Sequence, residues 1–66
     1  MNAWVLAEVD YEDFIILGVF STAEKAKAFL GAQITPNRDY WLEGYEVDKG
    51  YLGKEVMRDG KTWVKV

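Results

Sequence analysis

Carboxylates carry most of the chemistry that this chain could perform. Its 66 residues include no histidine and no cysteine, so it has neither a neutral-pH proton shuttle nor a thiol nucleophile. Glu8 with Asp10, and Glu46 with Asp48, are each two residues apart, which on a strand puts both carboxylates on one face. Such pairs can hold a hard cation or transfer protons, but they are commoner on solvated strands. We therefore expect no enzyme activity, no metal site and no cofactor.

The overall charge also limits the classes of partner. Eleven acidic residues outnumber eight basic ones, giving a net charge of −3, and five of the eight bases lie after residue 48. This distribution argues against a nucleic-acid binder, which normally presents a dominant basic face. No apolar run approaches the ~20 residues of a membrane span, and the N-terminus lacks the basic start of a signal peptide, so we expect a cytoplasmic protein that does not contact a membrane.

Aromatic side chains are the strongest indication of a binding function. Three Trp, four Tyr and three Phe are too many for a 66-residue domain to bury completely. Because Trp and Tyr are enriched in binding hot spots, we predict that the contacts with a partner come from this set. The candidates are Tyr40, Trp41, Tyr45, Tyr51 and Trp63. In an alternative interpretation, aromatic residues stack a nucleotide base and its phosphate meets Arg38, Lys54 or Arg58.

The first half of the chain predicts a β-hairpin followed by a helix. Residues 3–9 and 14–20 are apolar and rich in β-branched and aromatic residues, and the polar residues 11–13 between them predict a turn. Gly18 suggests a bulge or a close approach by the helix. Ser21 and Glu24 have the spacing of a capping box, so Ser21 is expected to be the N-cap of a helix over residues 22–33.

The second half predicts three more strand segments. Residues 40–48 alternate except at Gly44, where a bulge would restore the register. Residues 55–66 predict a hairpin around Asp59-Gly60, a type I′ sequence, with Val56 opposite Trp63 and Met57 opposite Thr62.

Together these elements predict an α+β fold in the order β-β-α-β-β-β, a small antiparallel sheet with one helix packed on one face. We expect a single domain over residues 1–66, in which a ββαβ unit (1–48) is extended by a C-terminal hairpin (49–66). A homodimer is favoured by the small core, by the many aromatic residues and by the first strand, whose residues are apolar on both of its faces.

Two segments resemble a known type of domain. The sequence GVFSTAEKAKAF (18–29), followed by LEGYEVD (42–48), is similar to a family of very small, mostly uncharacterised domains of phages and bacteria. The resemblance covers roughly residues 4–48. It implies two strands, a helix and a third strand, together with a phage origin, and it supplies no catalytic residues.

Three hypotheses for the function follow. The first is a small non-enzymatic protein-binding module, phage-encoded, that inhibits a host bacterial protein such as an antiviral defence component. The second is a dimer that sequesters a nucleotide or another small ligand. The third is an accessory structural domain with no dedicated ligand. We favour the first, because the chain combines many aromatic residues with no catalytic equipment.

Overall fold

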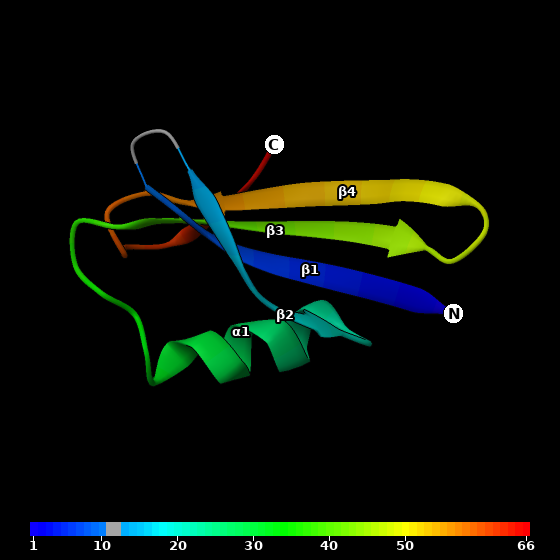
Figure 1. The fold of residues 1–66 in the computed structure, drawn as a ribbon, viewed down its shortest axis with the longest axis horizontal. Helices are drawn as coiled ribbons and strands as arrows, with labels where there is room; N and C mark the ends of the chain where they lie inside the picture. Colours follow the sequence, from blue (N-terminus) through cyan, green and yellow to red (C-terminus); the bar gives the residue numbers. More distant parts are fainter. Residues whose placement is uncertain (11–12) are drawn as a thin grey trace.

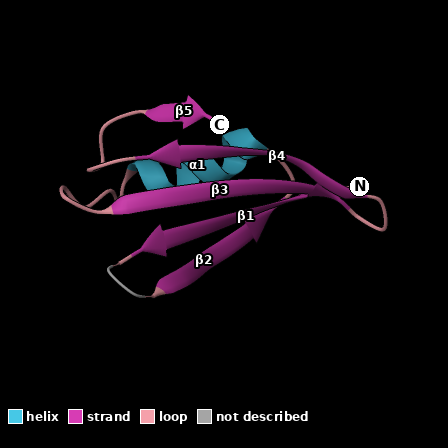
Figure 2. Ribbon diagram, turned by 90° about the horizontal axis from the view of Figure 1, so that it is seen from above, coloured by secondary structure: helices cyan, strands magenta, loops and turns pink. Residues whose placement is uncertain are grey.

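The computed structural model describes residues 1–10 and 13–66, and in this part of the chain five strands form one antiparallel sheet (Figure 1). The elements, in chain order, are β1 (Asn2–Val9), β2 (Phe14–Phe20), α1 (Ala23–Gly31), β3 (Asp39–Glu46), β4 (Gly50–Met57) and β5 (Trp63–Lys65). In space the strands lie in the order β2-β1-β3-β4-β5, so β2 and β5 are the two edges (Figure 2). The whole of α1 lies on one face of the sheet.

The predicted α+β layout, β-β-α-β-β-β, is wrong as a description of this fold. The described chain is mostly β, with a five-stranded antiparallel sheet and one nine-residue helix that buries only Ala26 and Leu30. The sheet order also departs from the chain order, because β3 pairs with β1 and so separates β4 and β5 from the first hairpin. This pairing joins residues 30 to 44 positions apart in the sequence, which local sequence patterns do not specify.

The β1–β2 hairpin contains the bulge that was predicted near Gly18. The register shifts between Leu6, which pairs with Gly18, and Ala7, which pairs with Ile16, so Leu17 is the extra residue. A β-carbon on Gly18 would lie 2.9 Å from the ring of Phe20, which explains the glycine. The predicted turn between the two strands includes residues 11 and 12, which lie outside the described residues.

The helix begins one residue later than the sequence predicts. Thr22, with an extended backbone, is the N-cap, and its hydroxyl accepts the Lys25 N–H at 3.1 Å. The predicted cap at Ser21 is therefore wrong, and the Ser21 hydroxyl instead accepts from the Lys25 ammonium at 3.3 Å. Phe29 then packs on Phe20 with ring centroids 5.2 Å apart, which attaches α1 to the end of β2.

The core lies between α1 and the middle of the sheet. Its largest fully buried side chains are Leu6, Leu30, Tyr40 and Leu42, and the partly buried Trp4 and Trp63 pack against them. The hydroxyl of Tyr40 accepts the Thr35 N–H at 2.9 Å, so this buried phenol is satisfied.

The C-terminal hairpin has the predicted turn but another register. Asp59 and Gly60 both have positive φ, as a type I′ turn requires, and Lys61 N–H donates to the Arg58 carbonyl at 3.1 Å. However, Met57 pairs with Trp63 and Val56 pairs with Val64, so both pairs are one position off the prediction. The predicted pairs Val56–Trp63 and Met57–Thr62 are therefore wrong, because Thr62 intervenes between the turn and the first pair. The shift puts Met57 and Trp63 together on the helix side.

The irregularity predicted at Gly44 lies at that position but in the neighbouring strand. Gly44 pairs with Gly53 and Tyr45 with Tyr51, so the extra residue is Leu52 of β4. As a result Tyr45 and Tyr51 share a face of the sheet.

Candidate functional site

The face of the sheet opposite α1, called the open face below, is not covered by any described segment (Figure 2). Strand alternation and the pairing registers place exposed apolar side chains from every strand except β1 on this face. They are Phe14 (58% exposed), Ile16 (56%), Val19 (62%), Tyr45 (37%), Tyr51 (59%) and Val64 (57%). An apolar surface of this kind is typical of an interaction site.

Trp41 is at the centre of the open face. Its ring lies 6.3 Å from that of Phe14, and the Lys54 ammonium is 4.0 Å from its centroid. Glu43 is paired with Lys54 across β3 and β4, so a carboxylate and an ammonium occupy neighbouring positions. The middle of the face is therefore balanced in charge, and aromatic and aliphatic contacts dominate it.

A tyrosine pair extends the aromatic cluster along β3 and β4. The rings of Tyr45 and Tyr51 are 5.8 Å apart at an interplanar angle of 70°, an edge-to-face arrangement. The Tyr45 hydroxyl donates to Glu43 Oε2 at 3.3 Å. The negative charge of Glu43 raises the pKa of Tyr45 above its ordinary value of 10.0, with a smaller contribution from desolvation. The phenol therefore stays a neutral donor at physiological pH.

Basic side chains border the open face at the β4–β5 hairpin. A hollow of about 360 Å³ lies there, lined by Val56, Arg58, Lys61, Thr62, Val64 and Val66. Within the described residues, no carboxylate forms an ion pair with Arg58 or Lys61. This end of the face thus combines an aliphatic floor with two uncompensated positive charges.

The five aromatic residues predicted to contact a partner fall on two sides of the sheet. Trp41, Tyr45 and Tyr51 lie together on the open face. Tyr40 is 1% exposed in the core, and the half-buried Trp63 packs on the helix side, with the Lys27 ammonium 5.8 Å from its ring. Sequence reasoning missed the aliphatic part of the face, although the apolar residues on both phases of β2 were a signal of it.

The three residues predicted to contact phosphate are not brought together. Arg38 forms ion pairs with Asp10 (3.1 Å) and Glu8 (3.7 Å). Lys54 lies over the Trp41 ring in the middle of the sheet, while Arg58 is four residues further on, about 13 Å along an extended chain.

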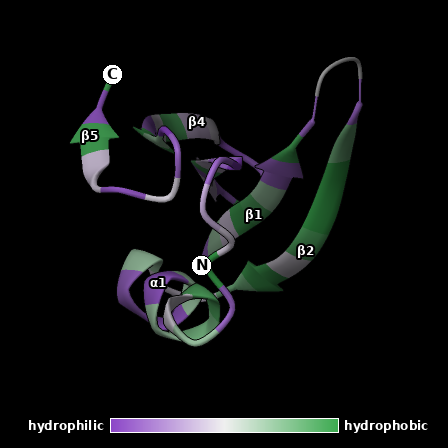
Figure 3. Cartoon of the chain, turned by 90° about the vertical axis from the view of Figure 1, so that its left-hand side faces the viewer, coloured by the Kyte–Doolittle hydropathy of each residue, from purple (hydrophilic) through white to green (hydrophobic). Residues whose placement is uncertain are grey.

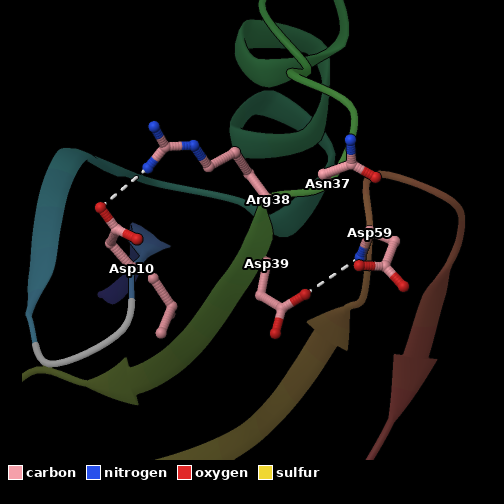
Figure 4. A pocket seen from close by; sticks show the side chains of 6 residues that line it. Asp10, Asn37, Arg38, Asp39 and Asp59 are labelled. Carbon is pink, nitrogen blue, oxygen red and sulfur yellow. Dashed lines mark hydrogen bonds and ion pairs between the residues drawn. The ribbon is translucent and has the colours of Figure 1, made fainter.

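Arg38 instead belongs to a junction at one end of the sheet (Figure 4). A hollow of about 580 Å³ there is lined by Val9, Asp10, Asn37, Arg38, Asp39 and Asp59. Asp39 Oδ1 accepts the Asp59 N–H at 3.0 Å, and Gly60 N–H donates to the Arg38 carbonyl at 2.9 Å. The described residues include no group of three ligands that could hold a metal ion. These contacts join the end of β1, the start of β3 and the β4–β5 turn, a structural role.

The acid pairs singled out in the sequence are accounted for in the same way. Glu8 and Asp10 share Arg38, whereas Glu46 pairs with Lys49 at 3.6 Å and Asp48 lies in the β3–β4 turn with positive φ.

Among the described residues, the nine-residue α1 is far too short and too polar to span a bilayer.

One family model matches the chain, that of a domain of unknown function (DUF7336), over residues 1–55. The match takes in β1, β2, α1 and β3 and most of β4, and it ends before β5. No curated protein and no solved structure matches the chain.

Proposed function

Since the chain belongs to the DUF7336 family of domains of unknown function, we propose a function from its own surface: it is a non-enzymatic module that binds another protein on its open face. The observation that carries this proposal is the cluster of Trp41, Tyr45 and Tyr51 beside exposed aliphatic side chains on an uncovered sheet. Large aromatic residues on rigid strands lose little conformational entropy when a partner binds, which makes them effective anchors.

The charges around the open face support a partner with an acidic surface. Arg58 and Lys61 flank the hollow over Val56 and Val64, and neither has a described counter-ion. An aliphatic floor with a basic rim fits a protein segment in which apolar side chains alternate with Asp or Glu. The partner proposed is therefore a protein surface that is apolar at its centre and acidic at its edge.

The resemblance of residues 18–29 and 42–48 to small phage and bacterial domains supports a biological setting for this binding. In that setting the chain is phage-encoded and acts in the host cytoplasm as an inhibitor of a host protein, such as an antiviral defence component. The inhibition would be by occupation of the host protein's acidic and apolar surface.

The experiment is an affinity capture from bacterial lysate with three forms of the tagged chain, followed by mass spectrometry of retained proteins and small molecules. Arg58→Glu reverses a charge on the rim, and Lys25→Glu makes the same change on the exposed surface of α1, on the other side of the sheet. We expect the wild type and Lys25→Glu to retain one protein in stoichiometric amount. Arg58→Glu should bind the purified partner about tenfold more weakly or worse.

A second variant tests the apolar part of the face. Tyr51→Ala removes a side chain that is 59% exposed and should weaken the same complex about 30-fold, as expected of a hot-spot residue. Equal binding by wild type, Arg58→Glu and Tyr51→Ala would overturn the open face as the binding site. Retention of a nucleotide in place of a protein would support the ligand-sequestering hypothesis, and retention of neither would support an accessory domain.

A further inference from the structure

The edge strand β2 is apolar along its whole length. Its sequence, FIILGVF, contains no charged residue and no proline, and Figure 3 shows it as a nearly continuous hydrophobic strand at the outer side of the sheet. Phe14, Ile15, Ile16 and Val19 are each 56–62% exposed. An edge of this composition presents unpaired backbone groups beside apolar side chains, the arrangement that natural sheets ordinarily protect.

The other edge shows what a protected edge looks like in the same molecule. β5 is only three residues long and carries a lysine at position 65. In β2 the bulge at Leu17 is the one feature that disturbs the edge, and it leaves residues 14–16 exposed on both sides of the sheet. No hydrogen bond from another described segment reaches the outer side of β2.

The chain exposes more surface than a compact monomer of its mass. A compact monomer of this mass exposes about 4,300 Å² by the usual scaling, whereas this 7.6 kDa chain exposes 4674 Å². A standard interface buries about 800 Å² on each partner, which would remove the entire excess.

We infer that the occupant of this edge is a second copy of the chain, with β2 pairing antiparallel to β2 of the copy to form a continuous ten-stranded sheet. An antiparallel self-pair sets each residue of β2 opposite another residue of the same strand, and because β2 has no charged residue, no pair of like charges arises within it. In an antiparallel pair centred on β2, Asp13 lies opposite residues 20–22, which are Phe, Ser and Thr. Because the contact is isologous, the assembly closes at two and leaves β5 at both outer edges.

This inference does not rest on the proposed function, since it concerns the edge of β2 and not the open face. It has a consequence for that face, however. Phe14, Ile16 and Val19 lie on the open face next to the edge, so the open faces of the two copies would join into one surface. A dimer would therefore present the docking surface twice on a single sheet.

Sedimentation equilibrium of the full chain tests the inference. The wild type is expected at twice the monomer mass of 7.6 kDa at tens of micromolar. In Ile15→Lys the new ammonium lies across from Glu8 within the same chain, which favours the monomer fold, while a charged side chain on an edge strand disfavours the pairing of that edge with another copy. We expect the dimer dissociation constant of Ile15→Lys to rise at least about tenfold.

Val64→Lys is the matched control, because Val64 has nearly the same exposure (57%) and lies on the opposite edge strand. It should remain dimeric, and circular dichroism checks that both variants are folded. If Ile15→Lys does not fold, Val19→Lys replaces it. A wild type that sediments as a monomer would overturn the inference, and so would a folded β2 variant that dimerises as tightly as wild type or a monomeric Val64→Lys.

Discussion

The indole of Trp4 lies directly against the backbone of Gly44 on the neighbouring strand. The two residues are paired in register between β1 and β3, and a β-carbon built on Gly44 would fall 2.6 Å from the Trp4 ring. Trp4 therefore uses the space that a side chain at position 44 would occupy and packs against the core under α1. This contact explains the glycine within β3 better than backbone flexibility does, since Gly44 does not have positive φ.

Gly44→Ala is expected to destabilise the fold, because the Trp4 ring must move away from its packing position. Overpacking of this kind costs about 1–3 kcal/mol in the free energy of unfolding. Gly53→Ala is the matched control: Gly53 is the β4 partner of Gly44, and its β-carbon would meet nothing within 4 Å. Urea denaturation should show a lower midpoint for Gly44→Ala and little change for Gly53→Ala; equal losses would contradict the steric explanation.

The ion pair between α1 and β4 gives a second prediction. The Lys27 ammonium lies 2.9 Å from Glu55 Oε1, and the two side chains are only 33% and 12% exposed. Because the mostly buried Glu55 carboxylate remains poorly solvated when it loses its partner, Lys27→Met should cost about 1–2 kcal/mol of unfolding free energy.

A double-mutant cycle measures the interaction itself. For Lys27 and Glu55 we expect a coupling free energy of about 1 kcal/mol, and for the exposed pair Lys49 and Glu46 (74% and 37% exposed) about 0–0.5 kcal/mol. A coupling at Lys27–Glu55 no larger than that of the exposed pair would mean that the helix is held to the sheet by apolar packing alone.

The Tyr45 phenol makes stability depend on pH in the alkaline range. Its pKa is raised above 10.0 in the folded chain, chiefly by the charge of Glu43. The folded state therefore holds this proton more tightly than the unfolded state. The resulting stabilisation is present below pH 10 and is lost as the pH rises through the folded-state pKa. Glu43→Gln should lower the pKa of Tyr45 towards 10.0, and high salt should lower it partly.

Spectrophotometric titration of tyrosinate checks this prediction. The difference between the titration of wild type and that of Tyr45→Phe isolates the Tyr45 phenol, and Tyr51→Phe serves as the control for the neighbouring ring. An unchanged Tyr45 pKa in Glu43→Gln would exclude the carboxylate as the cause.

Local elements were predictable from sequence where a single pattern decided them. The bounds of β2 follow from an uninterrupted apolar run between a polar turn and a helix cap, and the Asp59-Gly60 turn follows from its backbone preference. The N-cap was misplaced by one residue because Ser21 and Thr22 are both good caps, and the extended chain after Phe20 decides between them.

Features that depend on distant contacts were not predictable. The spatial strand order is set by the β1–β3 pairing, and the same pairing brings Arg38 to Glu8 and Asp10. Likewise, sequence could single out Trp and Tyr as candidates for partner contacts but could not assign them to a face. That assignment depends on the side of the sheet that α1 covers, so Tyr40 lies in the core whereas its neighbour Trp41 lies on the open face.

A comparison of Trp63→Ala with Tyr51→Ala separates the contributions of the two faces of the sheet to stability and to binding. The Trp63 ring packs on the core on the helix side and its backbone pairs with Met57, so Trp63→Ala should cost about 3 kcal/mol and lower the melting temperature by more than about 10 °C. Tyr51→Ala, on the open face, should change the melting temperature little but weaken partner binding. Differential scanning calorimetry beside a binding titration tests both variants together. A Trp63→Ala chain that keeps its melting temperature and loses its partner would place the binding surface on the helix side of the sheet.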